Sequence, residues 1–99
     1  MGKGGCIYIM TNKRKTTLYI GVTSDLRVRI QQHQSHYYPK SFTARYNLEN
    51  CVYYESFFSI EEAIAREKEI KKWRRDKKEA LINNLNPEWK DLWEEIKEW

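Results

Sequence analysis

Residues 6–22 of the sequence are CIYIMTNKRKTTLYIGV, two short apolar runs separated by a polar segment. Both runs contain several aromatic or β-branched side chains, which is typical of strands. Side chains alternate between the two faces of a strand, so Tyr19 and Gly21 of the second run share one face. The pattern therefore predicts a β-hairpin with strands at residues 6–10 and 18–22.

Helix and strand signals continue after the hairpin. The polar side chains of residues 23–25 can cap a helix, and they predict a helix over residues 26–34. Residues 35–47 have no periodic pattern, which predicts a loop that can include a short helical turn. The aromatic-rich run at residues 51–58 predicts a third strand.

The rest of the chain, residues 59–99, is predicted to be mainly helical. Ser59 and Glu62 have the spacing of a capping box, which predicts a long helix from there to about Trp73. Another helix is expected over residues 76–84. Asn86-Pro87 then has the pattern of a cap followed by the first residue of a last helix. The apolar residues of that last helix are expected to form one broad face: Trp89, Leu92, Trp93, Ile96 and Trp99.

The length and composition fit one globular domain. The chain has 99 residues, of which 40% are hydrophobic and 32% are charged, and a chain of this size supports one modest core. The expected element order is β-β-α-β-α-α-α. It predicts an α+β fold, a small antiparallel three-stranded sheet flanked by helices, in a single domain over residues 1–99 with a Trp-rich C-terminal helix.

Location and redox state follow from the same composition. No apolar run approaches the roughly 20 residues that a membrane helix needs, and the run at residues 6–10 is too short for a signal peptide. We expect a cytoplasmic protein with no membrane partner, and a monomer. Cys6 and Cys51 lie in strand-like runs without metal-site spacing, so buried reduced thiols are expected rather than a disulfide or a zinc site.

The charge is unevenly distributed. The net charge is +4, and residues 64–78 hold eight Lys or Arg against three acidic residues. A basic segment in a basic protein suggests a polyanionic partner such as DNA. A solvated helix face has the same composition, so charge alone leaves both interpretations open.

Glu67 interrupts the apolar side of the long predicted helix. It stands three residues after Ile64 and three before Ile70, which puts its carboxylate on the core-facing stripe. A carboxylate in that position is costly unless it is paired or binds a metal. Two interpretations of Glu67 therefore remain: an ion pair with a basic neighbour, or a metal site at the floor of a cleft.

Two further sets of side chains have a structural and a functional interpretation. Tyr8 and Tyr19 of the hairpin can simply pack, or a phenol can orient or deprotonate water. Gly21 leaves space two residues after Tyr19, as interior strand glycines do where a ligand or another backbone approaches. Arg29 and His33 lie one turn apart on the predicted helix, and an arginine at a cleft can stabilise a phosphoryl transition state.

Together these residues resemble the GIY-YIG nuclease family over roughly residues 5–75. Cys6-Ile7-Tyr8 stands where the family has Gly-Ile-Tyr, with cysteine in place of the glycine, and Tyr19-Ile20-Gly21 matches Tyr-Ile-Gly in full. Arg29 matches the catalytic arginine, and His33 a histidine of some branches. Glu67 matches the metal-binding glutamate. The chain is similar to the small stand-alone bacterial branch, and Asn86 is a candidate for the family's distal asparagine.

The resemblance implies a DNA endonuclease that depends on Mg²⁺ or another divalent cation such as Mn²⁺. It implies that Glu67 holds the metal, that Tyr19 activates water with help from Tyr8, and that Arg29 stabilises charge on phosphorus. His33 would either share the base role or orient Tyr8.

The basic segment just past Glu67 is expected to bind the DNA backbone through five side chains: Lys68, Lys71, Lys72, Arg74 and Arg75. Low sequence specificity or a preference for DNA structure is expected, with a role in DNA repair or processing by analogy with the family. For the aromatics Tyr37, Tyr38 and Phe42, packing is expected rather than base stacking. The alternative functions are a non-catalytic nucleic-acid-binding module and a protein-interaction module that uses the Trp-rich segment.

Overall fold

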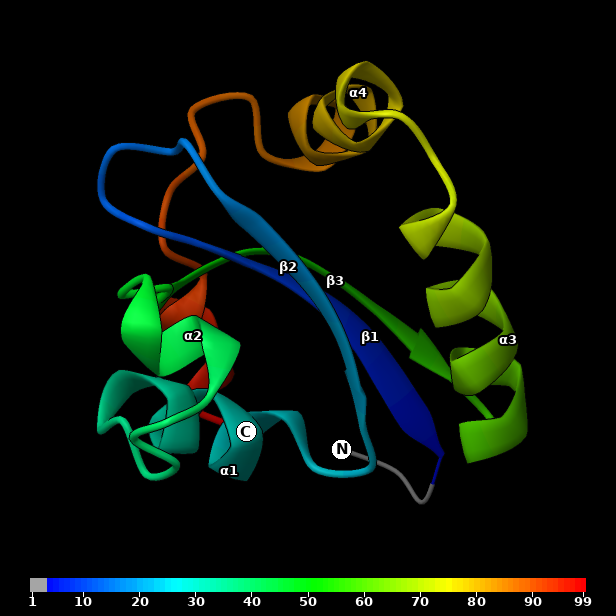
Figure 1. Cartoon of the computed structure of the whole chain (residues 1–99). Helices are drawn as coiled ribbons and strands as arrows, with labels where there is room; N and C mark the ends of the chain where they lie inside the picture. The colour runs from blue at the N-terminus through cyan, green and yellow to red at the C-terminus, as the bar shows by residue number, and fades with distance from the viewer. Residues whose placement is uncertain (1–3) are drawn as a thin grey trace.

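Three antiparallel strands form the centre of the protein, a computed structural model in which residues 4–99 are described. The central strand β1 (Gly5–Thr11) pairs with β2 (Leu18–Thr23) on one side and with β3 (Asn50–Phe57) on the other, as Figure 1 shows. The hairpin and the three-stranded antiparallel sheet predicted from the sequence are thus confirmed. In the hairpin register Tyr8 lies opposite Gly21.

Both faces of the sheet are covered by helices. On one face, Tyr8 and Met10 pack with buried residues of α1 (Leu26–Gln34) and α5 (Trp93–Ile96). On the other face, Ile7 and Ile9 pack with buried residues of α3 (Ile60–Lys71) and α4 (Arg75–Leu85). The short helix α2 (Phe42–Arg45) lies beside α1 in Figure 1. This arrangement makes every residue of β1 buried, which fits the continuous apolar run from Cys6 to Met10 within it.

Capping side chains set where the helices begin. Asp25 accepts a hydrogen bond from the Val28 N–H, and α1 has the predicted bounds. Both hydrogen bonds of the predicted capping box between Ser59 and Glu62 are present at the start of α3. The helical turn that the loop after α1 could contain is α2, which Ser41 caps by accepting from the Ala44 N–H. Short local patterns therefore predicted these starts because each cap depends on neighbouring residues only.

The predicted last helix is wrong. Instead of a long Trp-rich helix after Asn86-Pro87, the chain forms only the single turn of α5. The Asn86 side chain donates to the carbonyls of Val52 (3.1 Å) and Lys90 (2.8 Å) and accepts from the Lys90 N–H (3.1 Å). Trp89 has a φ of 53°, in the left-handed region that a helix does not use. Asn86 therefore ends α4 and closes a turn rather than beginning a new helix.

This turn divides the tryptophans between the two cores. Trp89 packs with the α3 and α4 side of the sheet, and Trp93 packs with the α1 and α5 side. The single broad Trp-rich face expected from the sequence is therefore not formed. Side-chain periodicity suggested one face, but the tertiary hydrogen bonds of Asn86 redirect the chain across the end of the sheet.

A half-buried ion pair ties α3 to the sheet. The Arg66 guanidinium donates two hydrogen bonds of 3.0 Å to the Glu55 carboxylate of β3, and it lies 5.2 Å from the centre of the Trp73 ring. Bidentate contacts of this kind fix geometry as well as adding energy. Because Arg66 precedes Glu67, the clamp also fixes the orientation of the helix that carries Glu67.

The thiols behave as expected, since Cys6 and Cys51 are both buried and free. Burial raises the pKa of the Cys51 thiol well above 9.0. In the part of the chain from residue 4 onward, none of the helices has the length and apolarity to span a membrane.

Candidate active site

Tyr8 lies at the centre of the site and has no exposed surface. Its ring fills the space that Gly21 leaves on the neighbouring strand. A Cβ atom added to Gly21 would lie 2.3 Å from Cζ of Tyr8 and 2.4 Å from its phenolic oxygen. Burial raises the pKa of the Tyr8 phenol well above 10.0, and nearby Arg29 opposes only part of that shift. Tyr8 is therefore a neutral, protonated phenol at pH 7.

Substituting Gly21 with alanine is expected to destabilise the protein by about 1–3 kcal/mol, the usual cost of overpacking a core. The Tyr8 ring cannot move aside because it is fully buried and hydrogen-bonded to His33. Urea unfolding followed by tryptophan fluorescence measures the cost. In a Tyr8→Ala background the added methyl group meets empty space, so its cost should largely disappear. An equal cost in both backgrounds would contradict this steric account.

His33 is held by both of its ring nitrogens. It is 7% exposed, with Nε2 2.8 Å from the Tyr8 hydroxyl and Nδ1 2.9 Å from Oγ1 of Thr43. Burial, and then the positive charge of Arg29, lower the pKa of His33 to about 4. The ring is neutral at pH 7, and neither nitrogen is left for a water molecule. Of the two roles that the sequence left open, this geometry favours orienting Tyr8 over sharing the base role.

Arg29 lies one turn before His33 on α1 and is half-buried. Its Nη1 donates to Oε1 of Gln32 at 3.0 Å, and its guanidinium carbon lies 5.6 Å from the centre of the Tyr38 ring. These contacts hold the guanidinium near the phenols of Tyr8 and Tyr19, and its charge favours the ionised form of Tyr8. A cation fixed in this way can stabilise developing negative charge without reorganising.

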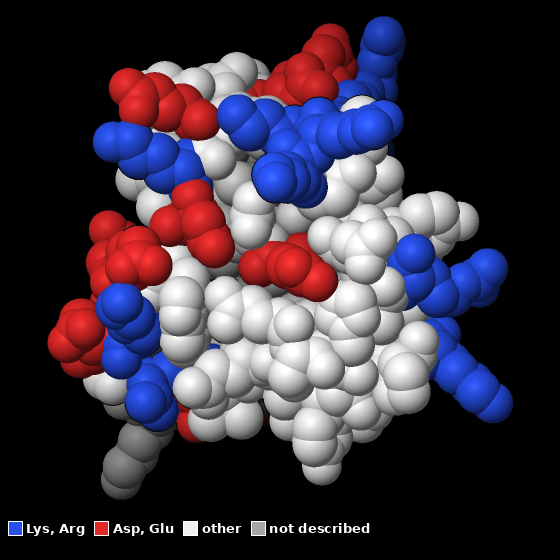
Figure 2. Space-filling model, turned by 90° about the vertical axis from the view of Figure 1, so that its left-hand side faces the viewer, with Lys and Arg blue, Asp and Glu red and all other residues white. Residues whose placement is uncertain are grey.

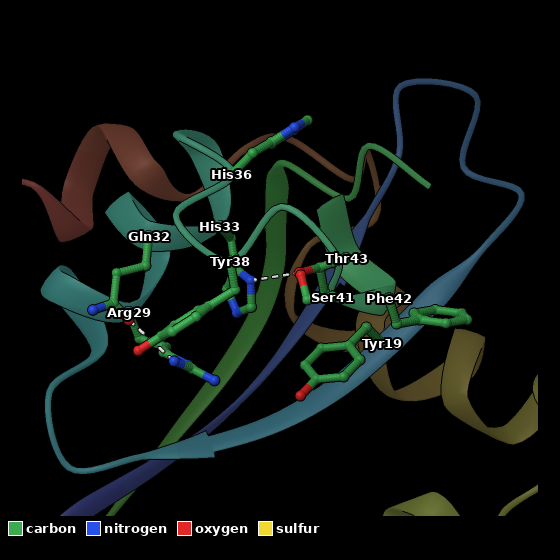
Figure 3. A pocket seen from close by; sticks show the side chains of 9 residues that line it. All are labelled: Tyr19, Arg29, Gln32, His33, His36, Tyr38, Ser41, Phe42 and Thr43. Carbon is green, nitrogen blue, oxygen red and sulfur yellow. Dashed lines mark hydrogen bonds between the residues drawn. The ribbon is translucent and has the colours of Figure 1, made fainter. Parts of the chain in front are cut away.

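A pocket of about 140 Å³ opens in front of these side chains. Figure 3 shows Tyr19 and Arg29 on the same side of it, with the dashed hydrogen bond between His33 and Thr43 behind them. Ligand pockets for whole small molecules are usually about 300–1,000 Å³. This one is smaller, so it fits a single group such as a phosphate.

Tyr19 is the phenol that faces the pocket. Its ring stacks on Phe42 at 6.3 Å and meets the edge of His33 at 5.8 Å. Within residues 4–99 its hydroxyl makes no hydrogen bond to another side chain, unlike that of Tyr8. Tyr19 is therefore positioned by its ring, while its hydroxyl stays available. Phe42 and Thr43 were not predicted as parts of the site, because α2 has no sequence motif that points to it.

Glu67 lies apart from this cluster. Its side chain is 13% exposed, and Oε2 lies 2.9 Å from Nζ of Lys71, the ion pair that was one of its two interpretations. It is not among the residues that line the pocket. In the described residues no three His, Cys, Asp or Glu side chains gather as a metal cage. A single carboxylate still suits Mg²⁺, which usually keeps several waters and binds one or two carboxylates plus a phosphate.

The basic residues predicted to bind DNA lie at the junction of α3 and α4, on the opposite face of the sheet from the pocket. Lys68 and Lys72 are exposed, and Arg74 is 91% exposed. Lys71 pairs with Glu67, as above. Arg75 donates to the carbonyls of Lys15 (3.0 Å) and Thr16 (2.8 Å), so it also holds the hairpin turn.

A second basic region was not predicted from the sequence. Lys13, Arg14 and Lys15 of the hairpin turn are all exposed. Figure 2 shows Lys and Arg side chains gathered near the top of one face, at the height where Figure 1 places the β1–β2 turn. Directly below them Figure 2 shows an acidic side chain, and below that a broad area without Lys, Arg, Asp or Glu. This face therefore combines a basic upper edge with a largely uncharged lower surface.

Comparison with known proteins gives consistent matches. Residues 4–80 match the family model of the GIY-YIG catalytic domain. A UPF0213 protein of Bacillus pumilus is 36% identical over 72 residues, 73% of this chain and 72% of that protein. A UPF0213 protein of Syntrophus aciditrophicus is 35% identical over 82 residues, 83% of this chain and 92% of that protein.

A solved structure supports the fold. The solution NMR structure of a UPF0213 protein from Bacillus halodurans superimposes with a TM-score of 0.55 and 31% sequence identity. The match covers 88% of this chain and 90% of that one. The α+β fold and the family resemblance, both predicted from the sequence, are thus confirmed.

Proposed function

The chain belongs to the GIY-YIG catalytic domain family, which has a nuclease-type fold, and we propose that it is a metal-dependent DNA endonuclease that hydrolyses phosphodiester bonds. The observation that carries this proposal is the convergence of Tyr19, Arg29 and His33 on one phosphate-sized pocket, with the buried Tyr8 hydrogen-bonded to His33 behind them. Each comes from β1, β2 or α1, so rigid elements hold the set.

Tyr19 is the residue that we propose to activate the attacking water. Its hydroxyl is free of side-chain partners within residues 4–99 and faces the pocket, whereas the Tyr8 hydroxyl is buried and engaged by His33. Tyr8 would assist by fixing the local geometry. Arg29 lines the same pocket as Tyr19 and supplies a positive charge there. The same guanidinium would stabilise negative charge on the phosphoryl group.

Glu67 is the residue that we propose to hold Mg²⁺ or Mn²⁺. When bound, the metal supplies Lewis-acid stabilisation of a phosphate oxygen and of the leaving oxygen. Glu67 is on α3 and Tyr19 faces α2, on opposite faces of the sheet. They are compatible with one substrate because β2 is an edge strand. A DNA backbone lying along that free edge can meet side chains from both faces.

The proposed substrate is DNA, recognised by structure or with weak sequence specificity, and the proposed setting is DNA repair or processing in the cytoplasm. The exposed turn Lys13–Lys15 and the exposed Lys68 and Lys72 could neutralise phosphates. Phosphate contacts position a nucleic acid without specifying its sequence. Exposed Tyr37, Tyr38 and Phe42 beside the pocket could contact unpaired bases, although their rings also contact one another or neighbouring rings.

Nicking of supercoiled plasmid by the purified protein tests the function. Nicking is expected with Mg²⁺ or Mn²⁺ and should stop when EDTA removes the metal. Tyr19→Phe keeps the ring contacts but removes the hydroxyl, and it should lower the rate about 100-fold or more, as loss of a general base does. The matched control is Tyr46→Phe, because Tyr46 is 48% exposed and packs on Phe42; it should stay near the wild-type rate.

Duplex, nicked, flap and branched oligonucleotides of one sequence extend the assay to substrate preference. Faster cleavage of flaps or branches than of plain duplex is expected. DNA binding without metal-dependent cleavage of any of them would favour the non-catalytic module instead. Equal rates for wild type and Tyr19→Phe would rule out the assigned role of the phenol.

A further inference from the structure

Thr43 is a buried polar residue in the wall of the pocket. It lies in α2, is 4% exposed, and its Oγ1 is 2.9 Å from Nδ1 of His33 and 3.2 Å from Oγ of Ser41. Ser41 is itself fixed as the N-cap of α2, because its Oγ accepts the Ala44 N–H. Figure 3 shows the His33–Thr43 contact at the back of the pocket. A short helix without a sequence motif therefore supplies polar contacts to the site.

The direction of these hydrogen bonds follows from their chemistry. A neutral imidazole has one N–H and one accepting nitrogen. The buried Tyr8 hydroxyl is protonated, and within residues 4–99 its only hydrogen-bond acceptor is Nε2 of His33, since Arg29 can only donate. Tyr8 must therefore donate to Nε2. The ring proton is then on Nδ1 and donates to Oγ1 of Thr43.

We propose that Thr43 is a positioning residue, which selects the Nδ1–H tautomer of His33 and through it fixes the Tyr8 hydroxyl beside Arg29. With its proton directed to His33, the Tyr8 oxygen presents its lone pairs to the guanidinium. Thr43 thus acts on the arrangement of Tyr8 and Arg29 without donating to the substrate. Its catalytic consequence rests on the proposed nuclease function, whereas the tautomer does not.

The substitutions Thr43→Val and Thr43→Ser separate the hydroxyl from the shape of the side chain. Valine keeps the branched shape but cannot accept from Nδ1–H, and a buried donor without a partner is unfavourable. The ring proton is then expected to move to Nε2. Nε2 can no longer accept the hydrogen bond of the Tyr8 hydroxyl, so the arrangement of Tyr8 is disturbed. Steady-state nicking should fall about 10-fold in kcat with little change in KM. Thr43→Ser keeps the acceptor and should restore most of the rate.

Nitrogen-15 NMR of the imidazole rings reads the tautomer directly and needs no substrate. The protein has two histidines, and His36, which pairs with Glu49 on the surface, is the internal control. The wild type is expected to show His33 as Nδ1–H, and Thr43→Val as Nε2–H, with His36 unchanged.

The outcomes separate the two proposals. Absence of nicking by the wild type would overturn the proposed function and leave the tautomer testable. A wild-type His33 in the Nε2–H form would overturn the inference even if the valine variant does not fold. Wild-type nicking with an unchanged rate and tautomer in Thr43→Val would also overturn it.

Discussion

Replacing Glu67 with glutamine is expected to lower the rate of Mg²⁺-dependent nicking about 1,000-fold or more. A bound metal contributes several kcal/mol of charge stabilisation to phosphoryl transfer, and about 1.4 kcal/mol corresponds to tenfold in rate. Glutamine has nearly the same size and can still accept a hydrogen bond from Lys71, which lies 2.9 Å from Oε2. It lacks the charge that a hard divalent cation requires. Nicking rates over a range of Mg²⁺ concentrations measure the loss.

The control for this variant is Glu61→Gln. Glu61 is an exposed carboxylate in the first turn of the same helix. Its replacement changes the charge of α3 by the same amount as Glu67→Gln, but at a position away from Glu67. It should nick at the wild-type rate. If Glu67→Gln nicks like the wild type but unfolds at lower urea concentration, Glu67 is only the structural partner of Lys71, and the metal assignment fails.

The parts of the fold that the sequence predicted depend on local patterns. The hairpin follows from two short apolar, strand-like runs, and α1 follows from its Asp25 cap and the apolar residues that come after it. The capping box of Ser59 and Glu62 is equally local. Such features need only a few neighbouring residues, so one sequence is enough to predict them.

The C-terminal segment shows where local patterns fail. The sequence Asn86-Pro87 suggested a helix start, but the Asn86 amide is used for the carbonyls of Val52 and Lys90. Val52 is 34 residues away along the chain. No local rule could predict that an asparagine would bridge to β3, and periodicity alone therefore predicted a long helix where α5 is a single turn.

In the candidate site, too, some features were predictable from local sequence motifs and others depend on tertiary contacts. Tyr8, Tyr19, Arg29 and His33 were found because the hairpin and α1 have recognisable sequence motifs. Their relation could not be predicted: the sequence left open whether His33 is a base or an orienting group, and only the two hydrogen bonds of its ring favour the second. Thr43 and Ser41 were missed because threonine and serine are ordinary residues in a loop, and only the tertiary structure brings them to His33.

Replacing Arg29 with alanine is expected to lower kcat by about 100- to 1,000-fold, the usual effect of removing one fixed donor to a transition-state charge. Arg29→Lys should recover part of the rate, because lysine keeps the charge but lacks the planar fork that contacts Gln32 and Tyr38. The matched control is Arg45→Ala, an exposed arginine of α2, which should have little effect. KM should change less than kcat, since the charge develops only in the transition state.

The same substitution has a second, independent consequence. The charge of Arg29 is one of the two causes that hold the pKa of His33 at about 4, the larger being burial. Removing a neighbouring positive charge favours the protonated ring, so the pKa of His33 should rise in Arg29→Ala toward its ordinary value of 6.5. An NMR titration measures this rise, and His36 again serves as the internal control. A large loss of nicking with no change in His33 would mean that Arg29 acts away from the Tyr8–His33 pair, and an unchanged rate would remove Arg29 from the catalytic set.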